Sequence, residues 1–166
     1  VRQLEGGLVR DVDSPANLLK VWFRDLPQRL LNHAADTRQQ RQRIAEARTP
    51  ADALALVQST VNKEELSVLL WLLDICAHVA LHEDVNRMSA KNLAIVFVPN
   101  MTDAAHLADG ELREDPMAAL RFQERLTAFF AHAIEARMEL VKERVAETER
   151  VFGDLLQRAM VPLYTP

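Results

Sequence analysis

The stretch from Leu66 to Leu81 constrains the fold more than any other part of the chain, because almost every side chain in it is apolar. Its only polar side chains are Ser67, Asp74 and His78. A helix that is apolar nearly all round is stable only when it is buried, and Asn62 is a good N-cap for it. We therefore predict a central core helix with neighbours on several sides. The side chains expected to pack against those neighbours are Leu69, Leu70, Leu73, Ile75 and Val79.

The rest of the chain favours an all-α fold in one domain. Its 166 residues are enough for one hydrophobic core, and 49% of them are apolar. Only four glycines occur, and good helix formers dominate the composition. Proline is favoured in the first turn of a helix, so Ser14-Pro15, Thr49-Pro50 and Asp115-Pro116 each indicate a helix start. We expect a single-domain helical bundle.

The charge balance requires neither nucleic acid nor an anionic membrane as a partner, because 24 acidic residues outnumber 20 basic ones. No apolar run approaches the roughly 18 residues of a membrane span. No signal peptide is visible, and the single Cys76 excludes an internal disulfide, so we expect a cytoplasmic protein. Val1 stands where an initiator methionine would, which predicts a fragment of a longer protein.

Residues 86–100, NRMSAKNLAIVFVPN, form a short apolar segment with three asparagines. Ser89 is a good N-cap. Pro99 disfavours helix at the preceding residue, so we expect the helix to stop near Phe97 and to leave Asn100 on the turn beyond it. From the chemistry alone, Asn86, Asn92 and Asn100 are caps and turn residues.

The first helix is expected to run from Ser14 to about Leu26, where Pro27 ends it. Lys20 and Arg24 are four residues apart, so they share one face of this helix. That face is either simply solvated or a small basic patch that meets the acidic or phosphate groups of a partner. The apolar side chains of the helix are Leu18, Leu19, Trp22, Phe23 and Leu26.

The sequence contains no self-contained catalytic apparatus. His78 and His82 have the spacing of two zinc ligands on a helix, but no third ligand lies nearby and the HExxH pattern is missing, so we expect no metal. Neither a glycine-rich phosphate loop nor a GxSxG motif occurs, and we expect no cofactor. Cys76 is interpreted as a small core residue without a reactive thiolate.

The C-terminal part changes character after residue 136. Residues 115–134 follow a loop at 101–114 and predict a helix with an apolar side. In residues 137–160 charged residues become more frequent, and apolar residues alternate at spacings of three and four, as in a coiled coil. Two alternatives remain: a last helix folded back on its own domain, or a helix that pairs with a second copy to form a homo-oligomer through residues 137–160. The expected seam is Met138, Val141, Val145, Thr148, Phe152 and Leu155.

Two motifs in this order resemble the RhoGAP domain family. Residues 18–27, LLKVWFRDLP, are similar to the LLKxxxRELP helix of that family, and NRM, NLA and VPN in residues 86–100 are similar to its NKM, NLA and xPN segment. WFRDLP and VPNMT most resemble the plant-type RopGAP branch. The resemblance covers residues 1–135 and implies an all-helical RhoGAP-type domain, followed by a helical extension at 136–166.

The resemblance implies a regulator that is not itself an enzyme. RhoGAP domains bind a small GTPase of the Rho, Rac or Rop type in its GTP state and speed hydrolysis. The matching positions place Lys20, Arg24 and Asn100 in the GTPase-facing groove. Arg24 is also expected to hold the catalytic loop of the domain, and Asn92 to support that face.

One family motif has no counterpart here, the arginine-finger loop of the G-[IL]-[FY]-R-x-[SN] type. Arg2 and Arg10 lack its context, so the resemblance implies an N-terminally truncated domain that starts after the finger loop and has no catalytic residue of its own. A finger is worth about 10³–10⁵ in hydrolysis rate. The leading hypothesis is therefore a GTPase-activating domain or its C-terminal portion. The alternative is a RhoGAP-like interaction module that binds a GTPase, or oligomerises, without activating hydrolysis.

Overall fold

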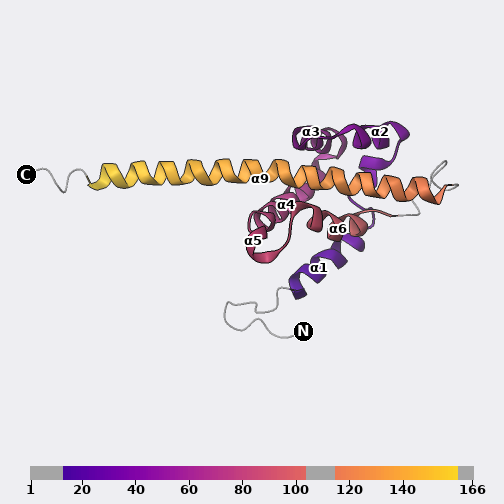
Figure 1. Ribbon diagram of the computed structural model, residues 1–166, viewed down its shortest axis with the longest axis horizontal. Coiled ribbons are helices and arrows are strands. Elements are labelled where there is room, and N and C mark those ends of the chain that lie inside the picture. Colours follow the sequence, from indigo (N-terminus) through magenta and orange to yellow (C-terminus); the bar gives the residue numbers. More distant parts are fainter. Residues whose placement is uncertain (1–12, 104–114, 161–166) are drawn as a thin grey trace, which may run out of the picture.

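The computed structural model describes residues 13–103 and 115–160, and within these ranges the regular structure is entirely helical. This confirms the predicted all-α class. Figure 1 shows one long helix with the shorter helices packed around one half of it. The elements are α1 (Asp13–Arg24), the 3₁₀ helix η1 (His33–Ala35), α2 (Arg38–Glu46), α3 (Pro50–Thr60), α4 (Lys63–Ala80), α5 (Glu83–Asn86), α6 (Ala90–Met101) and α9 (Pro116–Met160).

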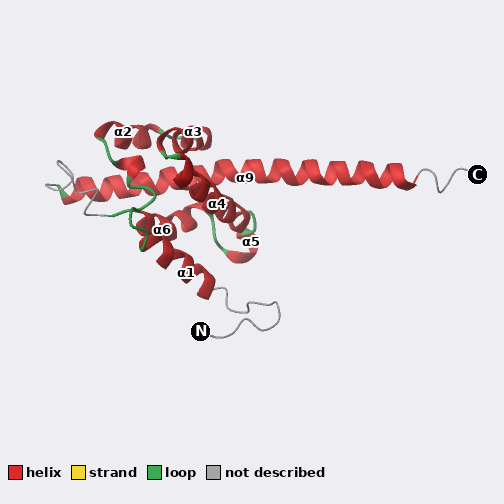
Figure 2. Ribbon diagram, turned by 180° about the vertical axis from the view of Figure 1, so that it is seen from behind, coloured by secondary structure: helices red, strands yellow, loops and turns green. Residues whose placement is uncertain are grey.

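The first half of α9 is the element around which the others assemble. It packs against α2, α3, α4 and α6. Figures 1 and 2 place α2 and α3 on one side of α9, and α1, α5 and α6 on the other. The apolar side predicted for this helix is buried except at Leu120, which is 52% exposed. The buried members of that side are Phe122, Leu126, Phe129, Phe130 and Ile134.

The prediction that the Leu66–Leu81 stretch forms the central helix is wrong. It forms α4, and Leu69 and Leu73 are fully buried as expected, but Trp71 is 50% exposed. Leu70, Ile75 and Val79 are only half-buried. An apolar surface on all sides indicates burial, yet it cannot say which of two apolar helices has more neighbours.

Cys76 lies on the buried face of α4, with 1% of its surface exposed. Burial raises the pKa of the Cys76 thiol to about 12, because a thiolate loses its hydration in an apolar core. The side chain is therefore protonated at neutral pH and acts as a small apolar group. This confirms its interpretation as a core residue.

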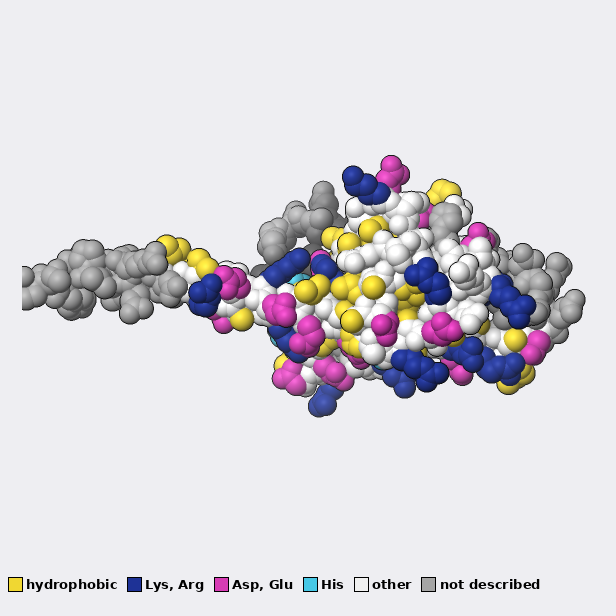
Figure 3. Space-filling model, turned by 90° about the horizontal axis from the view of Figure 1, so that it is seen from above, with side chains coloured by type: hydrophobic (Ala, Val, Ile, Leu, Met, Phe, Trp, Pro, Cys, Tyr) yellow, Lys and Arg dark blue, Asp and Glu magenta, His cyan; other side chains and the backbone are white. Residues whose placement is uncertain are grey.

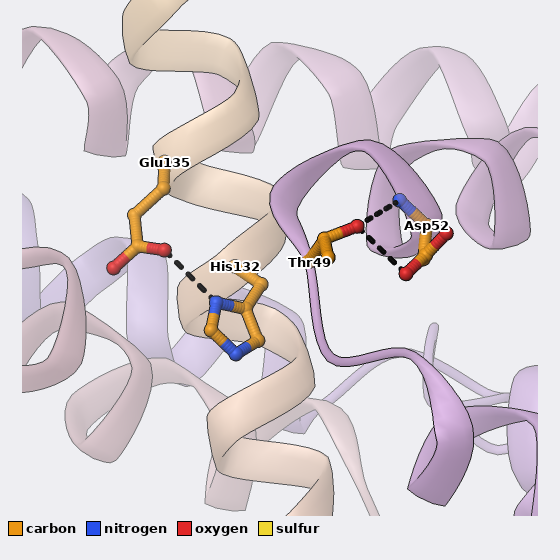
Figure 4. Close-up of polar contacts among 4 residues, drawn as sticks. All are labelled: Thr49, Asp52, His132 and Glu135. Carbon is orange, nitrogen blue, oxygen red and sulfur yellow. Dashed lines mark hydrogen bonds and ion pairs between the residues drawn. The ribbon is translucent and has the colours of Figure 1, made fainter.

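The helix starts follow the local chemistry of their caps. Thr49 Oγ1 accepts the backbone N–H of Asp52 at 3.2 Å and donates to Asp52 Oδ2 at 2.6 Å (Figure 4). Asn62 and Ser89 cap α4 and α6 in the same way, and Asp115 Oδ1 accepts the N–H of Met117 at 2.9 Å. Each such cap satisfies a donor that a first turn leaves unpaired.

Two predicted boundaries are wrong for α1. The helix begins at Asp13, so Ser14 and Pro15 lie inside its first turn and the predicted start at Ser14 is one residue late. Proline is tolerated there because a first turn has no partner for its N–H in any case. The helix ends at Arg24 and not near Leu26.

The prediction that α6 stops near Phe97 is also wrong, since the helix continues through Pro99 to Met101 and includes Asn100. Pro99 has no backbone N–H to donate, but it lies close to the end of the helix, where the last carbonyls have no intrahelical partner in any case. Two side chains then bond carbonyls of the last turn. Asn100 Nδ2 donates to Val96 O at 2.8 Å, and Thr102 Oγ1 donates to Val98 O at 2.9 Å.

The distal part of α9 does not fold back on the domain, so that alternative is wrong. The helix is continuous from Pro116 to Met160 and extends beyond all the other helices (Figure 2). Val145 is 48% exposed and Phe152 is 62% exposed. Within the described residues, no helix combines the length and the apolar character that a membrane crossing needs.

Candidate functional site

Helix α1 is held against α6 by one aromatic anchor. Phe23 has no exposed surface, and its ring meets the ring of Phe97 edge to face, with 6.4 Å between centroids. The Trp22 ring also meets the Phe23 ring edge to face, with 4.9 Å between centroids. Leu19 and Leu26 continue the same face and are half-buried against the core. This anchor fixes the position of the two predicted basic residues on α1.

A polar hollow of about 410 Å³ lies where the C-terminal ends of α1 and α6 meet, and we call it the α1–α6 hollow. Two of its cationic lining residues are Arg24, from the end of α1, and Arg29, from the following loop. Asp103, just beyond α6, supplies a carboxylate. The remaining lining residues are Leu26, Pro27, Gln28 and Asn32.

Three hydrogen bonds join the loop after α1 to the end of α6. Arg29 donates to Asn100 O at 3.2 Å, and the Leu31 N–H donates to Met101 O at 3.0 Å. The buried Asn32 accepts the Asp103 N–H on its Oδ1 at 3.0 Å. Because these bonds span the two ends, the hollow is a preformed part of the fold.

Of the predicted site residues Lys20, Arg24, Asn92 and Asn100, only Arg24 lines the α1–α6 hollow. Asn100 adjoins the hollow through the Arg29 bond to its backbone carbonyl, and Lys20 lies one helical turn before Arg24 on α1. The Arg24 side chain is 53% exposed and lies 3.4 Å from Asp25, an exposed pair that stabilises little. Asn100 is half-buried, and its amide donates within its own helix. A second amide hydrogen and the Oδ1 atom have no partner among the described residues.

Asn92 is not brought to this hollow. Its Nδ2 donates to Arg87 O at 3.0 Å, and its own N–H donates to Ser89 Oγ at 3.1 Å. Arg87 has a φ of 61°, so this bond helps to hold a left-handed turn before α6. Asn92 is eight residues from Asn100 on α6, a rise of about 12 Å. Asn86 is likewise a turn residue, because it bonds Val79 O and the Met88 N–H.

Sequence reasoning missed Arg29, Asn32 and Asp103. Arg29 and Asp103 stand in loops, where no periodicity marks a facing side chain. Asn32 offered a signal, since a polar residue between Leu31 and Ala34, both buried, needs a partner for its amide.

Within the described ranges, no three His, Cys, Asp or Glu side chains gather as metal ligands. His82 Nδ1 lies 2.9 Å from the backbone carbonyl of His78, so the ring of His82 contacts the last turn of α4. Arg2 and Arg10 lie outside the described residues. The polar groups that line the α1–α6 hollow are the guanidinium groups of Arg24 and Arg29, two side-chain amides and the Asp103 carboxylate. The guanidinium groups suit recognition of carboxylate or phosphate.

Comparison with known proteins identifies the domain. The model of the RhoGAP domain family matches residues 8–106, which is more than half of the chain. The chain belongs to the RhoGAP domain family. The matched range contains α1, α6 and the hollow between them, and it confirms the resemblance drawn from the two motifs.

The relatives of this RhoGAP domain include plant proteins, as the RopGAP-like motifs predicted. It is 28% identical over 142 residues to Rho GTPase-activating protein 1 of Arabidopsis thaliana, covering 86% of this chain and 27% of that protein. It is 35% identical over 122 residues to Rho GTPase-activating protein 3 of the same plant, covering 72% and 24%. Rho GTPase-activating protein gacA of Dictyostelium discoideum is 30% identical over 134 residues, covering 80% and 35%. The chain thus spans about a quarter to a third of the length of these relatives.

Proposed function

We propose that this RhoGAP domain binds a Rho- or Rop-family GTPase in its GTP state through the ends of α1 and α6, and stimulates GTP hydrolysis. The observation that carries the proposal is the α1–α6 hollow, which brings Arg24 to the end of the helix that holds Asn100. The relatives are named as Rho GTPase-activating proteins, which supports the same partner class.

In this proposal each residue has a separate task. Lys20 and Arg24 offer positive charge to acidic groups of the GTPase, and Asn100 offers the amide atoms that its own helix leaves unpaired. Arg29 positions Asn100 through its backbone carbonyl. Asn92 acts at a distance by holding the turn that precedes α6.

Replacing Lys20 or Asn100 with alanine should weaken binding to a Rho-family GTPase loaded with a non-hydrolysable GTP analogue by about 1–3 kcal/mol, because each variant loses a charged or partly buried hydrogen bond. Titration calorimetry measures this. Lys142→Ala is the matched control, since Lys142 is an exposed lysine on the distal part of α9. Wild-type affinity in both site variants would contradict the assignment.

Binding of the GTPase and stimulation of its GTP hydrolysis are separate properties, and both are measured with the same purified chain. The alternative function, binding without activation, follows from the finger motif that the sequence does not contain. A single-turnover measurement of phosphate release distinguishes them. We expect a rate of phosphate release well above that of intrinsic hydrolysis. The reason is that the domain can orient the water-positioning glutamine of the GTPase without an arginine finger. If the rate of phosphate release stays at the intrinsic value when the domain is saturating, the domain binds the GTPase without activating it.

We also propose that the exposed part of residues 137–160, beyond Val141, pairs with a second copy of the chain. Met138 and Val141 of the expected seam pack against the domain itself. The distal part of α9 carries a heptad pattern, and Val145, Val151, Phe152 and Leu155 are all at least 44% exposed in the single chain. With Val145 and Phe152 at position a, Arg144 and Glu149 fall at g and e. A parallel pair then sets opposite charges across the seam.

Sedimentation velocity tests this pairing. The full chain should sediment as a dimer, and Phe152→Glu should convert it to a monomer, because an acidic side chain would face its copy across the seam. Glu143→Gln, on the outer face, is the control and should leave the dimer intact. A wild-type chain that sediments as a monomer overturns the proposal.

A further inference from the structure

A second hollow, of about 350 Å³, lies between α2 and the beginning of α9 and is lined by four arginines. We call it the arginine hollow and define it by Arg38, Arg41, Arg121 and Arg125. Phe122 and Ala45 supply an apolar part of its wall. Figure 3, which looks onto the α2 and α3 side, shows Lys and Arg side chains over much of this face, with several close together at the lower right.

Two helices bring these cations together. Arg38 and Arg41 are three residues apart on α2, and Arg121 and Arg125 are four apart on α9, so each pair shares one face of its helix. The two helices pack against each other. The convergence is therefore set by the fold and not by one flexible segment.

Part of the cluster is held in place. Arg41 is half-buried, and its Nη1 donates to Ala35 O at 3.0 Å and to Asp36 O at 3.1 Å. A guanidinium has five N–H donors, so Arg41 keeps others for a ligand. Arg121 pairs with Asp115 at 3.1 Å. Among the described residues, no carboxylate pairs with Arg125.

In the direction of the C-terminus, the arginines that line the surface become fewer. A neighbouring hollow of about 380 Å³ shares Arg125 and is also lined by Arg48 and His132. His132 Nδ1 lies 2.9 Å from Glu135 Oε2 on the same helix (Figure 4). The lining of this neighbouring hollow includes two arginines, Arg48 and Arg125, whereas four line the arginine hollow, which makes the arginine hollow the stronger candidate for an anion.

We infer that the arginine hollow binds a compact anion with two or more phosphate groups, such as an inositol polyphosphate, either free or as a lipid headgroup. The planar forks of arginine match phosphate oxygens in pairs. Arg125 and Arg41 have no carboxylate partner among the described residues, so their positive charges favour a bound anion. The volume lies in the range of small-molecule sites, and Phe122 and Ala45 can pack against a ring. This net-acidic chain offers no general attraction for anions.

The arginine hollow is lined from α2 and α9, and the α1–α6 hollow from the end of α1, the loop that follows it and Asp103. Figures 1 and 2 place α2 on one side of α9, and α1 and α6 on the other. A phosphorylated ligand at the first therefore leaves the second accessible. The inference does not depend on the proposed GTPase function, and it is tested without any GTPase present.

The test uses the full chain with two probes, inositol trisphosphate in calorimetry and phosphatidylcholine vesicles with a minor fraction of phosphatidylinositol bisphosphate in co-sedimentation. We expect the double variant R121Q/R125Q to bind inositol trisphosphate at least about 100-fold more weakly, because each lost charge-assisted hydrogen bond is worth about tenfold. R43Q/R150Q removes two exposed arginines that do not line the arginine hollow and should bind as the wild type does.

Binding of both probes, lost in R121Q/R125Q, supports a lipid headgroup, and binding of inositol trisphosphate alone supports a free polyphosphate. The inference is overturned if the wild type binds neither probe, if R121Q/R125Q binds like the wild type, or if R43Q/R150Q loses as much affinity. Far-ultraviolet circular dichroism checks that the variants fold. If R121Q/R125Q does not, R121K/R125K keeps the charge and should still weaken binding through loss of the paired donors.

Discussion

Replacing Arg137 with methionine should lower the free energy of unfolding by about 2–4 kcal/mol. Arg137 is 8% exposed on α9, and its Nε and Nη2 each donate to one carboxylate oxygen of Asp74 on α4 at 2.7 Å. Removing one partner of a buried ion pair costs about 3–5 kcal/mol, because the other charge stays buried alone. We expect somewhat less here, since the Asp74 side chain is 33% exposed. Urea denaturation measures the change.

Two further variants show whether the loss comes from the unpaired carboxylate. The double variant Asp74→Leu with Arg137→Met removes both charges and should recover much of the stability, since apolar replacements of a buried pair are often neutral. Arg144→Met, on the exposed distal part of α9, should change stability by about 0.5 kcal/mol or less. If Arg137→Met is no worse than Arg144→Met, the ion pair does not join α4 to α9 energetically.

Replacing Phe23 with alanine should detach α1 from the domain. The side chain is fully buried, and truncating a buried phenylalanine costs about 3–5 kcal/mol through lost transfer energy and the cavity that remains. Helix α1 packs mainly on α6, so we expect the loss to appear as local opening of α1 and not as unfolding of α9. Hydrogen exchange should show faster exchange of the α1 amides and unchanged protection in residues 122–134.

The same variant should reduce GTPase binding, because Lys20 and Arg24 lose their fixed position. Val21→Ala is the control: Val21 lies on the same helix but is 39% exposed, and a small truncation there leaves the anchor in place. Full protection of α1 in Phe23→Ala would show that other contacts hold the helix and would remove this link between packing and binding.

The sequence predicted the features that local chemistry determines. Thr49, Asn62 and Ser89 are N-caps because each side-chain oxygen meets an N–H three residues on, and no distant residue is needed. The polar Asp74 inside an apolar stretch also carried information, since a buried carboxylate requires a cation. Its partner Arg137 is 63 residues away, and the sequence pattern does not identify that residue as the partner.

The parts that sequence reasoning missed depend on residues far apart or on compensation within a turn. Arg29 and Asn32 each bond a residue 71 positions away at the end of α6. Pro99 is a helix breaker in general, yet Asn100 and Thr102 bond carbonyls of the last turn and the helix continues. The four arginines of the arginine hollow look like ordinary solvated charges until α2 and α9 are placed side by side.

The continuity of α9 has a mechanical consequence. The same 45-residue helix carries Phe129 and Phe130 in the core and Phe152 far outside it. At 1.5 Å per residue, the portion beyond Val141 acts as a rigid spacer of roughly 28 Å. A group bound at the end of this helix is held at a fixed distance and orientation relative to the two hollows. Because the helix is continuous, a force that rotates its distal part also acts on the core packing of Phe129 and Phe130.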